Sequence, residues 1–226
     1  MPCLSPIMSS VENHNLELFI TESDDLDLSN ERLQSFSVKL IDPSESRSFV
    51  ERWHYSKNAT GGTYLYSFGL FHQGFLIGAC LYGPVAMRNV AQKYVEQEKD
   101  LIELRRLCCI DKTPKNTESY FVGKTIRWLK KNSKLKKIIS YADPHYGHEG
   151  TIYKASNFTY LGLTGKGCYI LDKTGTRRHN RTSTGSRIID GNRIFLPHAV
   201  DLQQQLSEGS AKIVKTEGKH IYTYDL

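Results

Sequence analysis

The sequence predicts an α+β protein with a mixed, largely antiparallel β-sheet flanked by helices. Two observations favour this class. Paired apolar runs joined by tight turns occur towards both ends of the chain, as in antiparallel hairpins, and amphipathic segments alternate with strands between them. With 226 residues, of which 39% are hydrophobic and 24% charged, the chain can bury a core of ordinary size.

The first expected elements are a short strand, a proline turn and a helix within residues 37–56. Ser44 is the expected first residue of this helix, which ends near Trp53. Residues 63–83 form the clearest hairpin, because two aromatic and aliphatic runs meet at Gln73–Gly74.

Periodicity and turn residues predict the remaining elements. In order they are a helix around 89–98, a strand at 101–110, a loop at 113–119, an amphipathic helix at 120–131, a buried strand at 136–143, a short helix at 150–157, a hairpin at 158–172 turning at Gly165 to Gly167, a helix from Pro197 to Glu208, and a hairpin or final strand at 212–226. Residues 173–193 are rich in Gly, Ser, Thr and Arg, so we expect a long mobile loop there.

Charge divides the chain near residue 36. Residues 1–36 hold seven acidic residues and one basic residue and so carry −6, which leaves +12 on the rest of a chain whose net charge is +6. We expect 1–36 to be an acidic, mobile leader and 37–226 to be a single domain. A domain this basic favours nucleic acid or an anionic cofactor as its partner.

The sequence predicts neither a membrane span nor an oxidising compartment. The longest apolar stretch, at 75–87, falls short of the roughly 20 residues that cross a bilayer. The N-terminus lacks the pattern of a secretory signal, and the five cysteines show no CxxC spacing. We therefore expect a cytoplasmic protein with reduced thiols, of unknown oligomeric state.

Two charged residues occur in otherwise apolar strands. Counting along the strand at 101–110 places Arg106 on the same face as Leu104 and Cys108. A buried arginine needs a partner, so Arg106 is either half of a structural ion pair, with Asp143 as the candidate, or a clamp for an anion or substrate. Asp143 ends the strand at 136–143, where it is either a turn residue or part of a ligand site.

The segment GTIYKASNF (150–158) resembles the LYxxxGF signature of the GNAT acyltransferase superfamily, with Asn157 in place of the glycine. In that superfamily the tyrosine, here Tyr153, donates a proton to the departing coenzyme A thiolate; a core tyrosine is the alternative. The loop KTPKNTES lacks the superfamily's glycines, but Asn116 and Ser119 at the following helix N-terminus can hold an anion.

Five blocks together resemble the Mom family of bacteriophage DNA-modification proteins: WHYSKNATGG (53–62), ELRRLCC (103–109), PKNTES (114–119), SYADPHYGHEGTIYKASNFTYLG (140–162) and KHIYTYDL (219–226). The resemblance implies a GNAT-like fold and an enzyme that places a carbamoylmethyl group on N6 of adenine in phage DNA, which protects the DNA from host restriction. It also implies acetyl-CoA and iron as cofactors. The site residues that it implies, all present here, are His54, Tyr55, Arg106, Ser119, Asp143 and Tyr153.

These residues fit chemistry at an exocyclic amine. The N6 lone pair is delocalised into the ring, so the adenine must leave the duplex and a base must take its proton. Asp143 or His54 is the expected base, Arg106 fixes a carbonyl or phosphate oxygen, Ser119 lines the anion site, and Tyr55 stacks on or bonds to the adenine.

A metal site is also predicted. His54 and Asp143, together with the pair His145 and His148, offer nitrogen and oxygen ligands for iron. The alternative is that the histidine pair belongs to a polar loop, because two histidines make only part of a site.

Basic residues gather on one face of the predicted helix at 120–131 and in the predicted loop at 173–193. They either contact DNA phosphates or form solvated surfaces, and they are Lys124, Arg127, Lys131, Arg177, Arg178 and Arg181.

Two other function classes stay open. One is an acetyl-CoA-dependent GNAT N-acetyltransferase acting on another amine, such as a modified nucleobase, a small molecule or a protein. The other is a DNA-binding protein without enzymatic activity.

Overall fold

The computed structural model describes residues 26–57, 59, 63–85 and 88–226. The chain divides into two compact units. Unit 1 comprises residues 1–141, 150–161 and 221–226, and unit 2 comprises residues 142–149 and 162–220. Most of the predicted leader lies outside the described residues, but Phe36 at its end is buried in the core.

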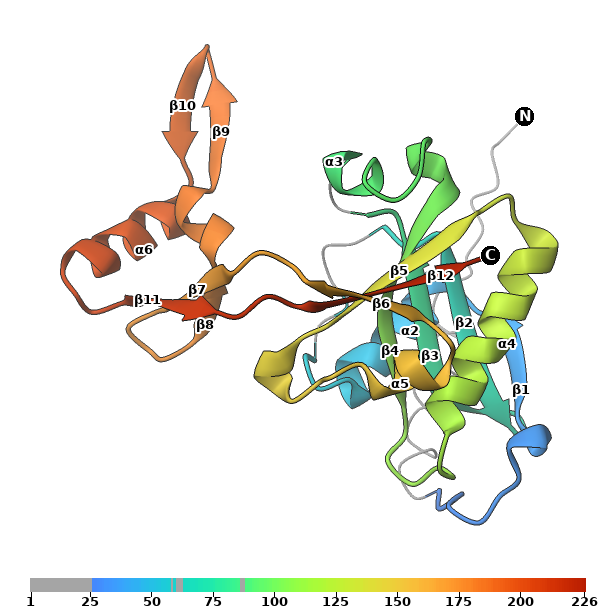
Figure 1. The fold of residues 1–226 in the computed structure, drawn as a ribbon. Helices are drawn as coiled ribbons and strands as arrows, with labels where there is room; N and C mark the ends of the chain where they lie inside the picture. Colours follow the sequence, from blue (N-terminus) through green and yellow to red (C-terminus); the bar gives the residue numbers. More distant parts are fainter. Residues whose placement is uncertain (1–25, 58, 60–62, 86–87) are drawn as a thin grey trace, which may run out of the picture. The chain divides into compact units, whose positions relative to one another are not determined.

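Unit 1 is built around a seven-stranded sheet (Figure 1). Its strand order is β1-β2-β3-β4-β5-β12-β6, and β1 to β4 pair antiparallel whereas β4 and β5 pair in parallel. The predicted α+β class with a mixed, largely antiparallel sheet is confirmed. The strands are β1 (Ser37–Leu40), β2 (Tyr66–His72), β3 (Phe75–Gly83), β4 (Leu101–Cys109), β5 (Lys137–Ala142), β6 (Thr159–Leu163) and β12 (His220–Asp225).

The predicted hairpin is confirmed as β2 and β3. Its turn residues Gln73 and Gly74 both have positive φ angles, 49° and 95°. Two successive residues with positive φ give a turn whose twist matches that of the flanking strands. A two-residue turn that contains glycine, as here, therefore favours a hairpin.

Helices α2 (Pro43–Trp53), α3 (Arg88–Ala91), α4 (Thr117–Asn132) and α5 (Thr151–Ala155) belong to unit 1, with 3₁₀ turns η2 (Leu33–Ser35) and η3 (Glu98–Asp100). Helix α2 begins at Pro43, one residue before the expected Ser44. Its N-cap is Asp42, whose carboxylate accepts the Ser44 N–H at 2.7 Å. Of the helix predicted at 89–98, only the start is confirmed, as α3. The residues after Ala91 form a turn and then η3. Helix α4 buries Phe121, Val122 and Leu129.

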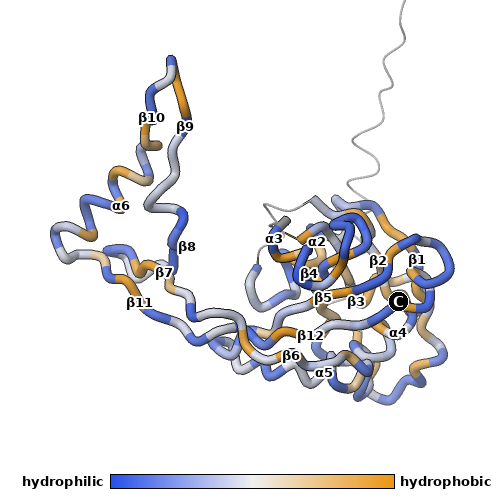
Figure 2. The backbone as a smooth tube through the Cα atoms, turned by 45° about the horizontal axis from the view of Figure 1, so that its top comes forward, coloured by the Kyte–Doolittle hydropathy of each residue, from blue (hydrophilic) through white to orange (hydrophobic). Residues whose placement is uncertain are grey.

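Unit 2 holds a three-stranded sheet in the order β11-β7-β8 and a separate two-stranded ribbon. Ile170 packs against Leu202 and Ala211 in the small core of this unit. Figure 2 shows part of β9 in the ribbon as hydrophobic (orange), and its Ile188 is 75% exposed. The elements are η4 (Pro144–Tyr146), β7 (Gly167–Leu171), β8 (Arg177–His179), η5 (Asn180–Thr184), β9 (Ser186–Ile189), β10 (Asn192–Phe195), α6 (Pro197–Ser207) and β11 (Lys212–Thr216).

Two predictions for this region are wrong. Residues 158–172 are not a hairpin, because β6 belongs to the seven-stranded sheet beside β12 while β7 pairs with β11 and β8. Residues 173–193 are not an irregular loop, since they contain β8, η5, β9 and the start of β10. The predicted final helix is confirmed as α6, and the C-terminal segment forms two strands in different sheets.

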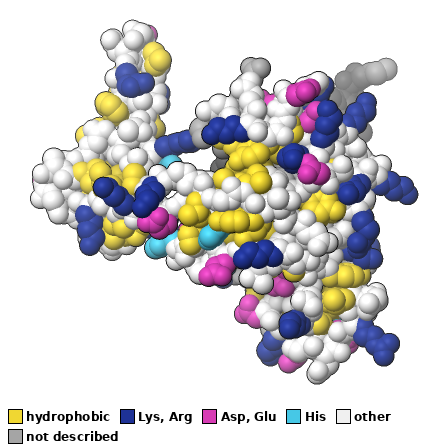
Figure 3. Space-filling view, in the orientation of Figure 1, with side chains coloured by type: hydrophobic (Ala, Val, Ile, Leu, Met, Phe, Trp, Pro, Cys, Tyr) yellow, Lys and Arg dark blue, Asp and Glu magenta, His cyan; other side chains and the backbone are white. Residues whose placement is uncertain are grey.

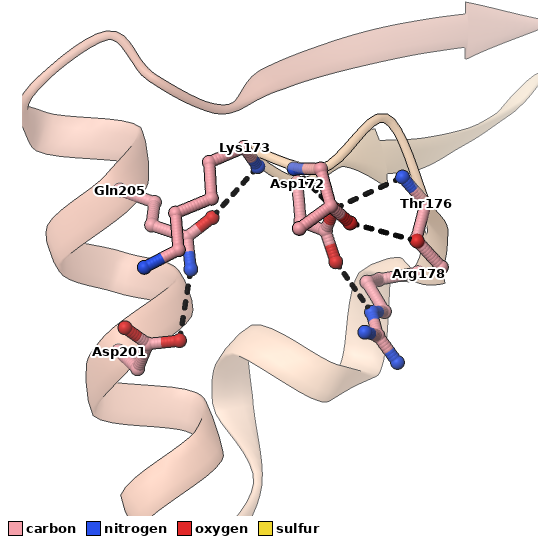
Figure 4. Close-up of polar contacts among 7 residues, drawn as sticks. Asp172, Lys173, Thr176, Arg178, Asp201 and Gln205 are labelled. Carbon is pink, nitrogen blue, oxygen red and sulfur yellow. Dashed lines mark hydrogen bonds and ion pairs between the residues drawn. The ribbon is translucent and has the colours of Figure 1, made fainter.

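Asp172 explains why the chain turns directly from β7 into β8 (Figure 4). Its carboxylate accepts hydrogen bonds from the backbone N–H groups of Thr174 and Thr176, both at 2.9 Å, and from Arg178 Nε at 2.8 Å. The hydrogen bond from the Thr174 side chain, followed by that from Arg178, lowers the pKa of Asp172. A turn closed by one ionised side chain gives this Gly- and Thr-rich stretch a defined structure.

Substituting Gly150 by alanine is expected to destabilise the protein by about 3 kcal/mol. Gly150 has a φ of +73°, and an added Cβ would overlap the ring of Tyr222. Gly147 is the matched control, because its φ is +72° and an added Cβ meets nothing within 4 Å. Gly147→Ala should therefore cost only about 1 kcal/mol. Urea unfolding of both variants checks this, and equal losses would contradict it.

Candidate active site

A β-bulge marks the middle of β4. Leu81 pairs with Arg106, whereas Tyr82 pairs with Leu104, so Arg105 is the extra residue. Because the bulge disrupts the alternation of side chains, Arg106 lies on the face opposite to that of Leu104, contrary to the count along the strand, but it still shares a face with Cys108. Pairing with β5 runs only from Leu101 to Leu104, and the two strands part where the bulge begins.

Tyr153 on α5 brings a protonated hydroxyl to the strand β5. The hydroxyl is hydrogen-bonded to the side chain of Ser140, whose Oγ donates to the Leu104 carbonyl at 2.9 Å. Burial raises the pKa of Tyr153 to about 12. Its ring packs against Tyr222 and Phe158, with centroids 5.2 and 5.5 Å away. A phenol held in this way stays protonated at neutral pH, as a proton donor must.

His54 and Tyr55 lie at the C-terminal end of α2. His54 is buried, and its Nδ1 accepts the backbone N–H of Ser56 at 3.1 Å. Nδ1 also lies 2.8 Å from Ser56 Oγ, so Ser56 already engages this nitrogen, which is not available to take a proton from a substrate. The Tyr55 ring centroid lies 4.2 Å from that of His54, and the Tyr55 side chain is 51% exposed. After burial, Tyr55 is among the smaller causes that raise the pKa of Tyr153.

Arg106 is half-buried on the part of β4 that follows the bulge. Its Nη1 donates to the Arg105 carbonyl at 2.7 Å. The charges of Lys57, Arg106 and Glu118 all act on the Cys108 thiol, so the segment after α2, β4 itself and α4 bring charged groups to this end of β4. Burial nevertheless raises the pKa of Cys108 to about 12, which keeps this thiol protonated and unreactive.

The predicted anion site lies at the first turn of α4. Asn116 has a left-handed backbone with φ of 70° and makes no side-chain cap, while Ser119 Oγ donates to the Asn116 carbonyl at 3.0 Å. First-turn N–H groups without a side-chain cap fit an anion such as a phosphate. Glu118 in the same turn places a negative charge beside it.

Asp143 lies in unit 2, directly after β5. Its carboxylate accepts the backbone N–H of His145 at 3.1 Å as the cap of η4. The other oxygen is 3.3 Å from Lys219 Nζ, and 13% of the Asp143 side chain is exposed. The structure therefore assigns Asp143 a lysine partner that the sequence did not indicate.

The predicted iron site finds no support. Within the described part of the chain, no three His, Cys, Asp or Glu side chains lie close enough to hold one metal ion. His145 and His148 instead lie in a ring cluster with Tyr146, 5.1 and 6.5 Å from its centroid.

Among the basic residues predicted to contact DNA, those on α4 are exposed, whereas Arg177 and Arg178 in unit 2 contact other side chains. Lys124, Arg127 and Lys131 are exposed on α4, and Figure 3 shows Lys and Arg side chains (dark blue) on that side of unit 1. In unit 2, Arg178 is held by Asp172, whereas Arg177 lies against aromatic rings.

The sequence reasoning missed Ser140 and Lys219. Ser140 has a signal, because it is the one polar residue within the apolar run IISYA and is fully buried. Lys219 gives no signal in the sequence, because lysine is usually exposed in proteins and this one lies 76 positions from Asp143. Its role appears only when the strands around it are placed.

Fold and site define an α+β protein that holds a protonated tyrosine hydroxyl where two parallel strands part. This chain belongs to the Mom protein family, whose model matches residues 35–224. It is also 30% identical over 132 residues to the "Methylcarbamoylase mom" of Escherichia phage Mu, which covers 56% of this chain and 54% of the relative. The chain thus aligns with about half the length of that curated relative.

Solved structures show weaker similarity. Arabidopsis thaliana NAA60 in complex with acetyl-CoA has 12% identity and a TM-score of 0.48 over 84% of this chain and 98% of that one. A GNAT family acetyltransferase from Elizabethkingia anophelis with acetyl-CoA bound has 10% identity and a TM-score of 0.43 over 85% and 99%. Similarity at this level concerns no more than the fold. Among the described residues, no helix is long and apolar enough to cross a membrane.

Proposed function

We propose that this protein is a transferase that places a carbamoylmethyl group on N6 of adenine in phage DNA and so protects the DNA from host restriction. The observation that carries the proposal is the match to the Mom family over residues 35–224, which includes every site residue implied by the resemblance. The Mu relative, named a methylcarbamoylase, supports the same reaction class.

The chemistry requires two proton transfers. As N6 bonds to the carbon of the incoming group it loses one proton, and the leaving atom departs with the bonding electron pair. Asp143 is the proposed acceptor of the N6 proton. Tyr153 is the proposed donor to the leaving atom, a role that its raised pKa and its hydrogen bond to Ser140 support.

Arg106, Tyr55 and the first turn of α4 bind and orient the reactants in this proposal. Arg106 offers a planar guanidinium to a carbonyl or phosphate oxygen. When bound, acetyl-CoA would supply a two-carbon unit, and Asn116 and Ser119 would hold its phosphates. The amide nitrogen of the carbamoylmethyl group would have to come from a separate amine or ammonia donor. Exposed Tyr55 offers a ring face to a base.

Mass spectrometry of nucleosides tests the proposal. Plasmid recovered after co-expression with the protein should contain carbamoylmethyl-adenine. Acetylation differs from this group by one NH unit in mass, so the spectrum separates the proposed reaction from that of an N-acetyltransferase. DNA binding without any altered nucleoside would show a DNA-binding protein instead and refute the proposal.

DNA binding through α4 should be strongly salt-dependent. Replacing Lys124, Arg127 and Lys131 together by glutamine should reduce the slope of log Kd against log salt by about 0.9 for each DNA phosphate that the variant leaves unneutralised. Fluorescence anisotropy over a salt series measures this. The matched control replaces three exposed lysines elsewhere on unit 1, Lys39, Lys93 and Lys99. Equal slopes for the two triple variants would contradict an α4 interface.

A further inference from the structure

Unit 2 contains a cleft of about 350 Å³. The volume lies in the range of small-molecule sites, about 300–1,000 Å³. Among its lining residues are Asp143, Tyr169, Arg177, His179, Thr216 and Lys219. Of these, only Asp143 belongs to the site residues that the family resemblance implies.

Strand register explains why polar and aromatic side chains meet at the cleft. Successive side chains of a strand point to opposite faces, and Ile170 of β7 packs against Leu202 on the side of α6. Tyr169 therefore points to the other face, together with its cross-strand partner His179. Arg177, two residues before His179, shares that face. Helix α6 covers the apolar face of the sheet, and the opposite face lines the cleft.

One wall of the cleft is a positively charged aromatic surface. The Arg177 guanidinium lies 4.2 Å from the Tyr169 ring centroid and 5.4 Å from that of Tyr146, whose hydroxyl accepts its hydrogen bond at 3.1 Å. The His145 ring meets Tyr169 edge-on at 5.7 Å. Aromatic rings and guanidinium planes are the groups on which nucleobases stack, and guanidinium also binds phosphate. This wall suits a nucleotide.

Asp143 and Lys219 add base selectivity. Their side chains place a hydrogen-bond acceptor 3.3 Å from a donor at the cleft. Adenine and cytosine present the complementary pair, an amino N–H beside a ring nitrogen. Guanine and thymine present a carbonyl oxygen at the position of the amino group, which the carboxylate repels. The pair therefore favours amino-substituted bases.

We propose that this cleft receives the extruded adenine nucleotide of the DNA substrate. The base stacks on the wall formed by Tyr169 and Arg177, and its N6 amino group faces the Asp143 carboxylate. Lys219 orients that carboxylate and donates to a ring nitrogen of the base. The inference rests on the proposed function, because it assigns the substrate site of the same reaction.

Binding to an unpaired adenine tests the cleft. The probes are two duplexes of one sequence, with the target adenine opposite either thymine or an abasic site. The wild-type protein should bind the second at least about tenfold more tightly, because no base pair has to be opened. Tyr169→Ala should reduce this preference to about twofold or less by removing the stacking surface, and leave binding to the paired duplex nearly unchanged.

Three further variants control for folding. Tyr169→Phe keeps the ring and should keep the preference. Ile213→Ala alters an exposed residue on β11 outside the cleft lining and should also keep it. Arg177→Gln removes the exposed guanidinium without altering the sheet's apolar face, so it should lose the preference even if Tyr169→Ala proves unstable. A preference retained in both Tyr169→Ala and Arg177→Gln overturns the proposal.

Two other probes, an unpaired guanine and coenzyme A, test which nucleotide the cleft binds. An unpaired guanine should show no preference in the wild-type protein, and equal binding of adenine and guanine overturns the selectivity. Coenzyme A also contains an adenine nucleotide. If Tyr169→Ala weakens binding of coenzyme A but not the preference for unpaired adenine in DNA, the cleft is a cofactor site and the proposal is wrong. Modified adenine in recovered plasmid tests the proposed function separately from all of these.

Discussion

Tyr153→Phe is expected to lower adenine modification by at least about 100-fold, the smaller end of the effect of removing a general acid. Phenylalanine keeps the ring that packs on Tyr222 and Phe158 and removes only the hydroxyl. Ser140 still donates to the Leu104 carbonyl in the variant, so unfolding free energy should fall by only about 1 kcal/mol. Mass spectrometry of nucleosides and thermal unfolding measure the two effects together.

Tyr160→Phe is the matched control, because Tyr160 also packs on Tyr222 but is 47% exposed on β6. It should modify adenine as the wild type does.

Since burial raises the pKa of Tyr153 to about 12, raising the pH from neutral to about 10 should not deprotonate Tyr153 or reduce activity through its loss of a proton. Normal modification by Tyr153→Phe would refute the donor role, and a large loss of stability would favour a core tyrosine.

Arg106→Lys is expected to lower modification by about 100-fold while the free energy of unfolding changes by less than about 0.5 kcal/mol. A lysine keeps the charge but cannot reproduce the planar fork that holds a carbonyl or phosphate oxygen at two points. If Arg106 were only a structural ion-pair partner, Arg106→Ala would instead cost on the order of 3 kcal/mol, and activity would fall only with the amount of folded protein.

Arg105 provides the control for Arg106, because it is the neighbouring arginine in the same bulge. Arg105 donates to the Pro84 carbonyl and lies 3.8 Å from Glu103, so its contacts are within the fold. Arg105→Lys should lose some stability and keep modification per folded molecule. A fully active, stable Arg106→Lys protein would exclude the clamp.

Local sequence predicted the elements whose boundaries depend on nearby residues. The hairpin of β2 and β3 followed from its apolar runs and from Gln73 and Gly74, and α6 followed from its periodicity and its proline start. Helix α2 shows the limit of this reasoning, because Asp42 and Ser44 are both good caps and only the observed hydrogen bond separates them.

Long-range pairing produced the errors. The segments 158–163 and 167–171 are neighbours in sequence and each has the pattern of a strand, which predicted a hairpin. In the structure each pairs with a strand from the C-terminal segment, β12 or β11. A strand pattern reports the backbone preference and the buried face of a segment, but not which edge it will join.

By itself the sequence determined the α+β class, most helices and strands, the basic domain and the family blocks that contain Tyr153, Arg106 and Asp143. Only the tertiary structure decided which groups these residues meet: Ser140 beneath the Tyr153 hydroxyl, the bulge before Arg106, and Lys219 beside Asp143. The reason is physical. Propensity, capping and turn conformation depend on residues a few positions apart, whereas ion pairs, pKa shifts and clefts depend on distances that strand pairing sets across the whole chain.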